Sequence, residues 1–225
     1  MSEVTISPSL MCLDWLNAKK QILELQESKL VDYFHVDIID GKFAPDFTMG
    51  SSIINSLLKI INLPLDYHLM TYEPKEYFDS FPLIRGSYFS IHQESTRNLH
   101  RDLISIRQKG FKNGVAISPG TSLDTLEYII EDVDMIIVMT VNPGYLGQPL
   151  VPQAIKKIEK LKNLIMDMKL DVKISVDGNV NLKTLPDMLL AGANHAVLGS
   201  SGLFGEKNLT KQLEIIKNTI SKYKN

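Results

Sequence analysis

The sequence contains little cysteine, no long apolar run and no excess of basic charge. Its single cysteine, Cys12, excludes a disulfide within the chain and is typical of a reducing compartment. No run of about 18 apolar residues is present that would predict a membrane-spanning helix, and Met1–Glu3 offers no basic start of a signal peptide. With 24 basic and 26 acidic residues the net charge is -2, so bulk electrostatics do not favour nucleic acid. We therefore expect a cytoplasmic protein that binds neither nucleic acid nor membrane.

The composition is that of an ordinary globular protein. Of the 225 residues, 44% are hydrophobic and 22% are charged. A chain of this length can bury one substantial core. No linker, low-complexity tract or shift in composition divides it, so we predict a single domain over residues 1–225.

Apolar segments of two periodicities alternate along the chain. Short runs predict eight strands, at residues 4–8, 33–37, 65–70, 88–92, 114–118, 135–140, 172–177 and 196–199. Segments of helical spacing predict eight helices, at about residues 18–30, 53–61, 74–80, 97–108, 123–130, 152–169, 181–191 and 209–223. Asp14 or Asn17 could cap the first of these helices.

The alternation predicts the fold class. Strand ends recur every 27 residues or so, roughly the length of one βα unit, and strands that are apolar on both faces belong to a covered parallel sheet. An open doubly wound sheet could use the same units. We predict an α/β fold, a closed (β/α)8 TIM barrel, because polar residues gather where nearly every strand ends, which is the face that carries the chemistry in such barrels.

His35 and Asp37 stand at the end of the second predicted strand, before Gly41. Residues two apart in a strand point the same way, so the imidazole and the carboxylate share a face. Other polar residues end strands that would meet at the same mouth: Ser9, His68, His92, Thr140 and Asp177.

The two histidines His35 and His68 and the two acids Asp37 and Asp177 can together bind one divalent cation. A mixed nitrogen and oxygen set suits Zn²⁺, Fe²⁺, Mn²⁺ or Co²⁺ rather than the oxygen cages of Ca²⁺ or Mg²⁺. His92 also ends a strand, and we expect it to bond its neighbour Glu94 and to support the site or the structure.

Glycine-rich loops follow strands six, seven and eight. They are Val141–Pro149, Asp177–Asn179 and Gly199–Gly202. Such loops can bring backbone N–H groups close to an anion, and loops after strands seven and eight form the common phosphate site of these barrels.

A metal, two carboxylates and a phosphate site together indicate chemistry on a phosphorylated ketose. A cation bound to the ketone and its neighbouring hydroxyl acidifies the intervening C–H and stabilises an enediolate. Asp37 and Asp177 come from different sides of the mouth, so one could remove the proton and the other return it to the opposite face. This inverts a stereocentre without an organic cofactor.

The sequence resembles the ribulose-phosphate 3-epimerase family nearly end to end. The resemblance is carried by Ser7–Leu10, His35–Asp37 with Asp40-Gly41, Asp66–Met70, Met139–Gly144, Gly147-Gln148, Val176–Gly178 and Gly192–Asn194. It implies an isomerase, a carbohydrate epimerase, with one divalent metal ion, a small sugar-phosphate substrate and a homo-oligomeric assembly.

The resemblance also implies roles for individual residues. The metal ligands would be His35, Asp37, His68 and Asp177, with Asp37 as proton acceptor and Asp177 as proton donor in one direction. Substrate contacts would come from Ser9, His68, Gly144, Tyr145, Leu146, Gly147, Gly178, Asn179, Gly199, Ser200 and Ser201. Met70 and Met139 would line the pocket.

Several positions depart from the family pattern. Ile39 stands in place of a methionine, Leu146 in place of a small residue and Asn179 in place of a second glycine, while Leu10–Cys12 replaces an alanine-rich stretch. Some of these features, with Gln148-Pro149 and Ser201–Phe204, are similar to the branch that acts on D-allulose 6-phosphate. That sugar is therefore the expected substrate, with D-ribulose 5-phosphate as the alternative.

Two further functions fit a barrel with this outline. A sugar-phosphate decarboxylase or aldolase would use the same phosphate loops, although no lysine ends a strand to form a Schiff base. A non-catalytic sugar-phosphate-binding protein would keep the loops, but would not require the complete set of metal ligands.

Overall fold

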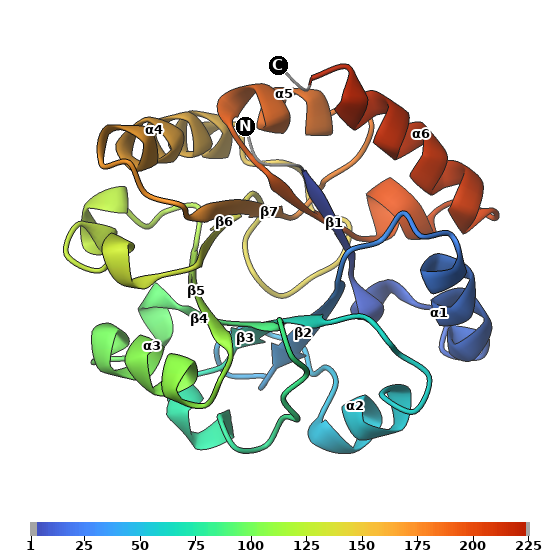
Figure 1. Cartoon of the computed structure of the whole chain (residues 1–225), viewed down its shortest axis with the longest axis horizontal. Helices are drawn as coiled ribbons and strands as arrows, with labels where there is room; N and C mark the ends of the chain where they lie inside the picture. The colour runs from blue at the N-terminus through green and yellow to red at the C-terminus, as the bar shows by residue number, and fades with distance from the viewer. Residues whose placement is uncertain (1–3, 224–225) are drawn as a thin grey trace.

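A computed structural model describes residues 4–223, so Met1–Glu3, on which the signal-peptide prediction rests, lies outside the described residues. Eight parallel strands form one sheet that curls around a central axis, with helices on the outside (Figure 1). The strands are β1 (Thr5–Pro8), β2 (Phe34–Ile39), β3 (Leu65–Met70), β4 (Tyr88–His92), β5 (Lys112–Ile117), β6 (Met135–Met139), β7 (Lys173–Asp177) and β8 (His195–Leu198). The predicted TIM barrel is confirmed.

The sheet is paired continuously except at one seam. Its order is β1-β8-β7-β6-β5-β4-β3-β2, and each neighbouring pair is joined by a parallel ladder. Between β1 and β2 the structure has a single parallel bridge, from Ser9 to His35. Below it, Ile6 O accepts N–H bonds from Asp32 and Tyr33, at 3.0 and 3.2 Å. The barrel is therefore closed by few bonds at the point where two predicted site residues meet.

Six α-helices cover the described part of the barrel. They are α1 (Ala18–Glu27), α2 (Ser51–Leu57), α3 (Leu99–Gln108), α4 (Gln153–Asp167), α5 (Leu185–Ala191) and α6 (Leu209–Ser221). None of the helices described is long and apolar enough to cross a membrane. Asn17 occupies the cap position of α1, but its side chain bonds Asp14 instead of the helix.

Two of the eight predicted helices are wrong. The segment 74–80 holds only a 3-10 turn, η2 (Pro74–Tyr77), and the segment 123–130 holds η4 (Leu123–Leu126), followed by η5 (Ile130–Asp132). Each segment is short, and an isolated turn gains little until more of its apolar face is buried. In the second segment Leu126 and Ile130 are buried, but the backbone forms two separate 3-10 turns instead of one α-helix.

The predicted start of α5 is also wrong, by four residues. Pro186 has no N–H and suits only the first turn of a helix, which places the start at Leu185. Before it, Asn181 and Thr184 form a side-chain-bonded turn, in which the hydroxyl of Thr184 accepts the N–H of Asn181 at 3.1 Å. Similarly, α2 begins at Ser51 and ends at Leu57 rather than spanning 53–61.

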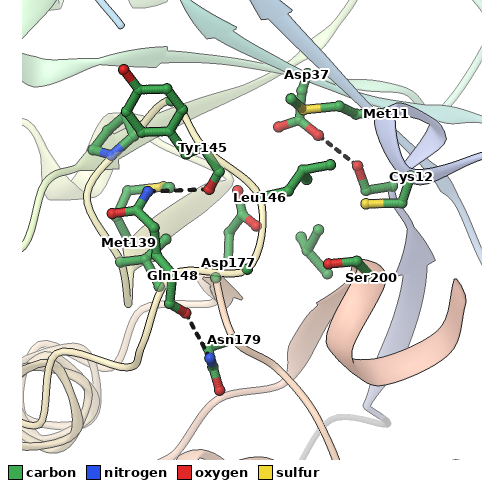
Figure 2. Close-up of a pocket in the computed structure, with 18 of the residues that line it drawn as sticks. Met11, Cys12, Asp37, Met139, Tyr145, Leu146, Gln148, Asp177, Asn179 and Ser200 are labelled. Carbon is green, nitrogen blue, oxygen red and sulfur yellow. Dashed lines mark hydrogen bonds between the residues drawn. The ribbon is translucent and has the colours of Figure 1, made fainter. Parts of the chain in front are cut away.

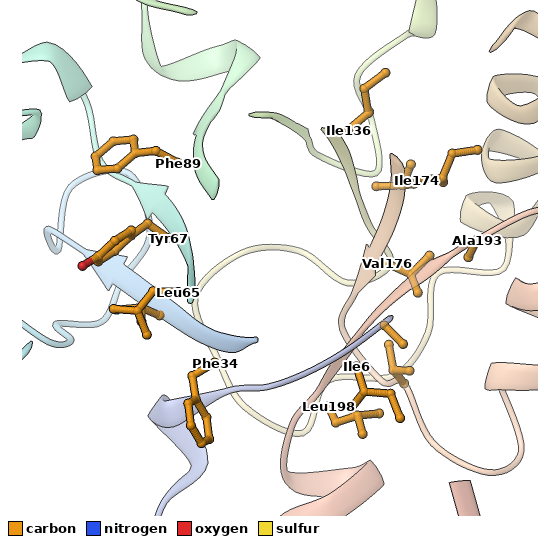
Figure 3. Packing of buried hydrophobic residues seen from close by; sticks show 14 of the residues in the cluster. Ile6, Phe34, Leu65, Tyr67, Phe89, Ile136, Ile174, Val176, Ala193 and Leu198 are labelled. Atoms are coloured by element: carbon orange, nitrogen blue, oxygen red, sulfur yellow. The ribbon is translucent and has the colours of Figure 1, made fainter. Parts of the chain in front are cut away.

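Hydrophobic packing has two layers. The larger one lies between the outer face of the sheet and the helices. There Tyr67 packs against Phe89, and Leu65 lies between Tyr67 and Phe34 (Figure 3). A smaller cluster, Tyr88, Ala116, Met135, Ile137 and Met139, comes from alternate residues of β4 to β6 and fills that half of the barrel interior. Buried polar residues of β1, β2, β3, β7 and β8 occupy the other half, namely Ser7, His35, Asp66, His68, Ser175 and His195.

Candidate active site

The ends of β2, β3 and β7 bring four predicted site residues together. In β2, Phe34, Val36 and Ile38 pack outward into the main core, so His35 and Asp37 point into the barrel. The register pairs Asp37 with His68 of β3. Asp177 ends β7 on the other side of the mouth, paired with Met139.

These four side chains converge on one point. One ligand atom from each of His35, Asp37, His68 and Asp177 lies within 4.8 Å of all the others. His35 Nε2 lies 3.1 Å from Asp37 Oδ1 and 3.6 Å from Asp177 Oδ2. His68 Nδ1 lies 3.3 Å from each of the same two oxygens. Two nitrogens and two carboxylate oxygens therefore surround a common centre.

The donor set fits a divalent metal ion. His68 Nδ1 is fully buried and forms no hydrogen bond within the described part of the chain, although two carboxylate oxygens face it. Two carboxylates this close inside a protein need positive charge between them. Two imidazoles with two carboxylates are ligands typical of Zn²⁺, Fe²⁺, Mn²⁺ or Co²⁺. The cluster could therefore hold such an ion.

The charges of the cluster shift its pKa values in opposite directions. Burial acts to lower the pKa of His35, but the carboxylates of Asp37 and Asp66 outweigh it and raise that pKa well above its ordinary value. Burial acts to raise the pKa of Asp37 and of Asp177, and in both cases the histidines outweigh it and lower the pKa. In the metal-free protein, the attraction between imidazole and carboxylate therefore favours the charged form of both.

A buried carboxylate supports His35 from behind. His35 Nδ1 lies 2.7 Å from Asp66 Oδ2, and His195 Nε2 approaches the same oxygen at 3.2 Å. Asp66 and His195 are both fully buried. Because Asp66 can only accept, His35 carries a proton on Nδ1 and presents Nε2 to the cluster.

His68 is supported through a second histidine. Its Nε2 lies 2.9 Å from His92 Nε2, and His92 Nδ1 lies 3.0 Å from Glu94 Oε2, the bond expected from the sequence. Burial lowers the pKa of His92 to about 4, more than Glu94 raises it. His92 is therefore neutral near pH 7 and is not itself within the metal cluster.

A pocket opens above Asp37 and Asp177, as Figure 2 shows. It encloses about 650 Å³, including the solvent at its mouth. Met70 and Met139 line the pocket, as predicted. So does every predicted substrate-contacting residue except His68, namely Ser9, Gly144, Tyr145, Leu146, Gly147, Gly178, Asn179, Gly199, Ser200 and Ser201. His35 and His68 lie buried beneath its floor. Among the described residues no lysine or arginine lines the pocket, so an anion there would meet neutral donors.

Comparison with known proteins decides the family. The family model for the ribulose-phosphate 3 epimerase family matches residues 5–204. The chain belongs to this family. It is 34% identical over 215 residues to ribulose-phosphate 3-epimerase of Bacillus subtilis, covering 95% of this chain and 98% of that protein. It is 36% identical to the enzyme of the same name from Methanocaldococcus jannaschii, covering 92% and 86%. Family membership makes the chain an isomerase of the carbohydrate epimerase class.

The fold is shared more widely than the family. KGPDC from Streptococcus mutans superposes with a TM-score of 0.66 over the full length of both chains, at 13% sequence identity. Identity this low establishes only the common barrel. The ribulose-phosphate 3-epimerase relatives lend no support to the narrower expectation of the D-allulose 6-phosphate branch.

The backbone explains one departure from the family pattern. Gly178 has φ +109 and Asn179 has φ +51, so both lie in the left-handed region. Asparagine is one of the few residues with a side chain that adopts this region readily. Its side chain also makes a new link, because Asn179 Nδ2 donates to Gln148 O at 2.6 Å and joins the loops after β6 and β7.

Leu146, a second departure, lies at the rim of the pocket and is 52% exposed. It lines the pocket and also a neighbouring apolar hollow with Met11, Trp15 and Phe47. In Figure 2 its side chain extends over the pocket on the side of Met11 and Cys12. Ile39, the third departure, is buried in the wall of the pocket.

The sequence analysis missed the residues behind the cluster. Asp66 precedes His68 by two residues in the same strand, and this spacing alone places both side chains on one face of β3. His195 begins β8, which is five strands away from the β3 strand of Asp66 in the sheet order and three strands away across the seam between β1 and β2. No local pattern joins these two, because only closure of the barrel brings them within hydrogen-bonding distance.

Proposed function

We propose that this protein is a metal-dependent ketose-phosphate 3-epimerase that interconverts D-ribulose 5-phosphate and D-xylulose 5-phosphate. The observation that carries the proposal is the buried convergence of His35, Asp37, His68 and Asp177 at the floor of the pocket. The ribulose-phosphate 3-epimerase relatives support the choice of sugar. This is the alternative of the two substrates expected from the sequence.

The four ligands would hold one divalent ion, of zinc, iron, manganese or cobalt. When bound, the ion draws electron density from the ketone and its neighbouring hydroxyl and so acidifies the C3–H bond. The two histidines are held by Asp66 and His92 in the orientation that this requires. No residue of the proposed site calls for an organic cofactor.

Asp37 and Asp177 would transfer the proton on opposite faces of the sugar. Each presents one oxygen to the histidines, Oδ1 of Asp37 and Oδ2 of Asp177. Asp37 Oδ2, the oxygen that is not directed at the histidines, accepts the hydroxyl hydrogen of Ser9 at 2.6 Å and would receive the C3 proton. Asp177 Oδ1 is then the atom that returns a proton to the other face.

Apolar side chains around the two acids would keep water from the enediolate. Met70, Met139 and Ile39 are each at most 4% exposed and line the same pocket. Exclusion of water prevents the intermediate from being protonated at random. The same walls confine the sugar between the two carboxylates.

The glycine-rich loops would hold the phosphate. Gly144–Gly147, Gly178-Asn179 and Gly199–Ser201 face one another across the end of the pocket. Without a basic side chain among the described lining residues, the donors for the phosphate would be neutral, and they include backbone N–H groups and the hydroxyls of Ser200 and Ser201. We also expect a homo-oligomer in the cytoplasm, and sedimentation of the purified protein would test the assembly.

Turnover on two sugars tests the proposal. After reconstitution with each candidate metal, we expect kcat/KM to be higher for D-ribulose 5-phosphate than for D-allulose 6-phosphate. A preference for the six-carbon sugar would restore the narrower expectation and overturn the substrate assignment. Turnover of neither sugar by a metal-loaded protein would overturn the epimerase proposal, and release of carbon dioxide from a keto-acid phosphate would indicate a decarboxylase.

A further inference from the structure

A chain of polar contacts runs behind His68 and away from the pocket. His68 Nε2 meets His92 Nε2 at 2.9 Å, and His92 Nδ1 meets Glu94 Oε2 at 3.0 Å. The other oxygen, Glu94 Oε1, accepts the backbone N–H of Ser118 at 2.8 Å and the hydroxyl of Thr121. His68 and His92 are fully buried, so water does not substitute for these partners.

The donors at the far end fix the direction of every bond. A backbone N–H can only donate and a carboxylate can only accept, so Glu94 accepts at both ends. His92 must therefore carry its proton on Nδ1 and accept at Nε2. The neutral form of His68, which is the form that binds a metal ion, must then carry its proton on Nε2. Its lone pair is left on Nδ1, the atom that faces the oxygens of Asp37 and Asp177.

We propose that His92 and Glu94 are positioning residues that set the tautomer of His68 and so keep Nδ1 available to a metal ion. The inference rests on the proposed metal site and deepens it. His35 obtains the same result from one carboxylate, Asp66. The tautomer of His68 is instead set through a second imidazole. It therefore depends on which nitrogen of His92 carries the proton, as well as on the shape of the His92 side chain.

If His92 served only to pack against His68, its variants would respond differently in metal binding. The rings of His68 and His92 stack with centroids 5.0 Å apart and planes 27° apart, so a side chain of similar shape could preserve the packing. Packing responds to volume, whereas the proposed role responds to which atoms donate and accept. Variants that keep the side-chain volume but change the hydrogen-bond donors and acceptors therefore distinguish a packing role from the proposed role.

Glu94→Gln is the sharpest such variant. Its amide oxygen has to face the N–H of Ser118, which leaves the NH₂ group facing His92 Nδ1. His92 would then accept at Nδ1 and donate from Nε2, and His68 would have to carry its proton on Nδ1, the atom intended for the metal. Glu94→Ala removes the carboxylate without reversing the chain. We therefore expect Glu94→Gln to weaken metal binding more than Glu94→Ala.

His92→Leu and His92→Gln form the second pair. Leucine keeps an apolar volume but offers no acceptor, and we expect it to weaken Zn²⁺ and Co²⁺ binding about 10–100-fold, the usual effect of losing such a partner. The amide oxygen of glutamine can accept from His68 Nε2, so His92→Gln should recover most of the loss. His100→Gln, at a histidine that is 60% exposed, is the control for changing a histidine elsewhere.

Metal competition with a chromophoric chelator gives the dissociation constants, and ¹⁵N NMR of the imidazoles reports the tautomer of His68. Thermal unfolding of the metal-free variants identifies any that fail to fold. Equal metal affinity in Glu94→Gln and Glu94→Ala, with an unchanged His68 tautomer, would overturn the inference while leaving the metal site intact. Failure of the unaltered protein to bind Zn²⁺ or Co²⁺ would instead overturn the metal site of the proposed function.

Discussion

Asp37 and Asp177 would have the same role as metal ligands but different roles in proton transfer. Because they would act on opposite faces of the sugar, each variant should lose epimerisation and keep the exchange that its remaining carboxylate performs. We expect Asp177→Asn to exchange the C3 hydrogen of D-ribulose 5-phosphate with deuterium oxide while its epimerisation falls about 10²–10⁴-fold. Asp37→Asn should show the reverse preference, for D-xylulose 5-phosphate.

Proton NMR of the recovered sugars measures this exchange, and metal analysis of each variant shows that the site is still loaded. Exchange at C3 of both epimers by one variant would mean that a single base serves both faces. That result would contradict the two-carboxylate arrangement.

Asn179 combines a left-handed backbone with a stabilising side chain, and two substitutions separate the two effects. Asn179→Ala keeps the left-handed backbone, at φ +51, and loses two side-chain bonds, the one donated to Gln148 O and the one that Asn179 Oδ1 accepts from Asn181 Nδ2 at 2.8 Å. We expect it to lower the free energy of unfolding by about 1–3 kcal/mol. Asn179→Gly loses the same bonds but adopts the left-handed backbone without strain, so it should lie closer to the unaltered protein. Urea unfolding measures both, and the opposite order would refute this account.

At the scale of elements, α4 holds the loop that follows β5. Lys157 of α4 donates through Nζ to the carbonyls of Ser118, Pro119 and Thr121, at 2.9, 2.8 and 2.6 Å. Lys157→Met keeps the apolar stem and removes the donor to all three carbonyls, of which Ser118 O still accepts the N–H of Thr121. We therefore expect a loss of about 1.5–3 kcal/mol in stability. Lys156→Met, at an exposed neighbour, is the control and should change thermal unfolding little. Equal behaviour of the two variants would contradict the anchoring role.

The elements differ in how far the sequence predicts them. Strands were predictable, because each has a row of apolar residues on its outer face that packs against the helices, even where its inner face is polar, as in β2 and β3. Helices were less predictable, because their ends depend on local side-chain bonds. The Asn181–Thr184 turn delays α5, and this turn is not visible in apolar spacing.

At the candidate site, too, the sequence predicts some residues and not others. Strand-end position alone selects His35, Asp37, His68 and Asp177 as a group, because the carboxyl ends of all strands meet in a barrel. The pairing of Asp66 with His195 needs contact across the barrel interior, over 129 positions in the sequence. No local spacing expresses a contact of that kind.

For the whole molecule, the candidate metal site lies beside the weakest join of the barrel. One bridge, from Ser9 to His35, connects β1 to β2 at the mouth, and the hydroxyl of Ser9 bonds Asp37 across the same seam. A metal ion bound by β2, β3 and β7 would tie strands on several sides of the interior. Metal binding should therefore stabilise the fold as well as supply the chemistry.

The size of that stabilisation should increase with pH. Without metal, the raised pKa values of His35 and His68 contribute stability that is complete below the unfolded value of 6.5 and is lost as pH rises through the folded values. The lowered pKa values of Asp37 and Asp177 contribute stability above the unfolded value of 3.8, which is constant between pH 6 and 8.5. Metal competes with the histidine protons, so its affinity rises over the same interval.

We therefore expect the metal-free protein to lose thermal stability from pH 6 to 8.5. Over the same pH range, the increase in Tm on adding Zn²⁺ or Co²⁺ should become larger. At a free metal concentration of about 1,000 times Kd the ion contributes about 4 kcal/mol, which is roughly 8–16 °C for a chain of this size. Differential scanning calorimetry at several pH values measures the increase, and Asp177→Asn should reduce it. An increase that shrinks with rising pH would show that the ion binds somewhere other than these two imidazoles.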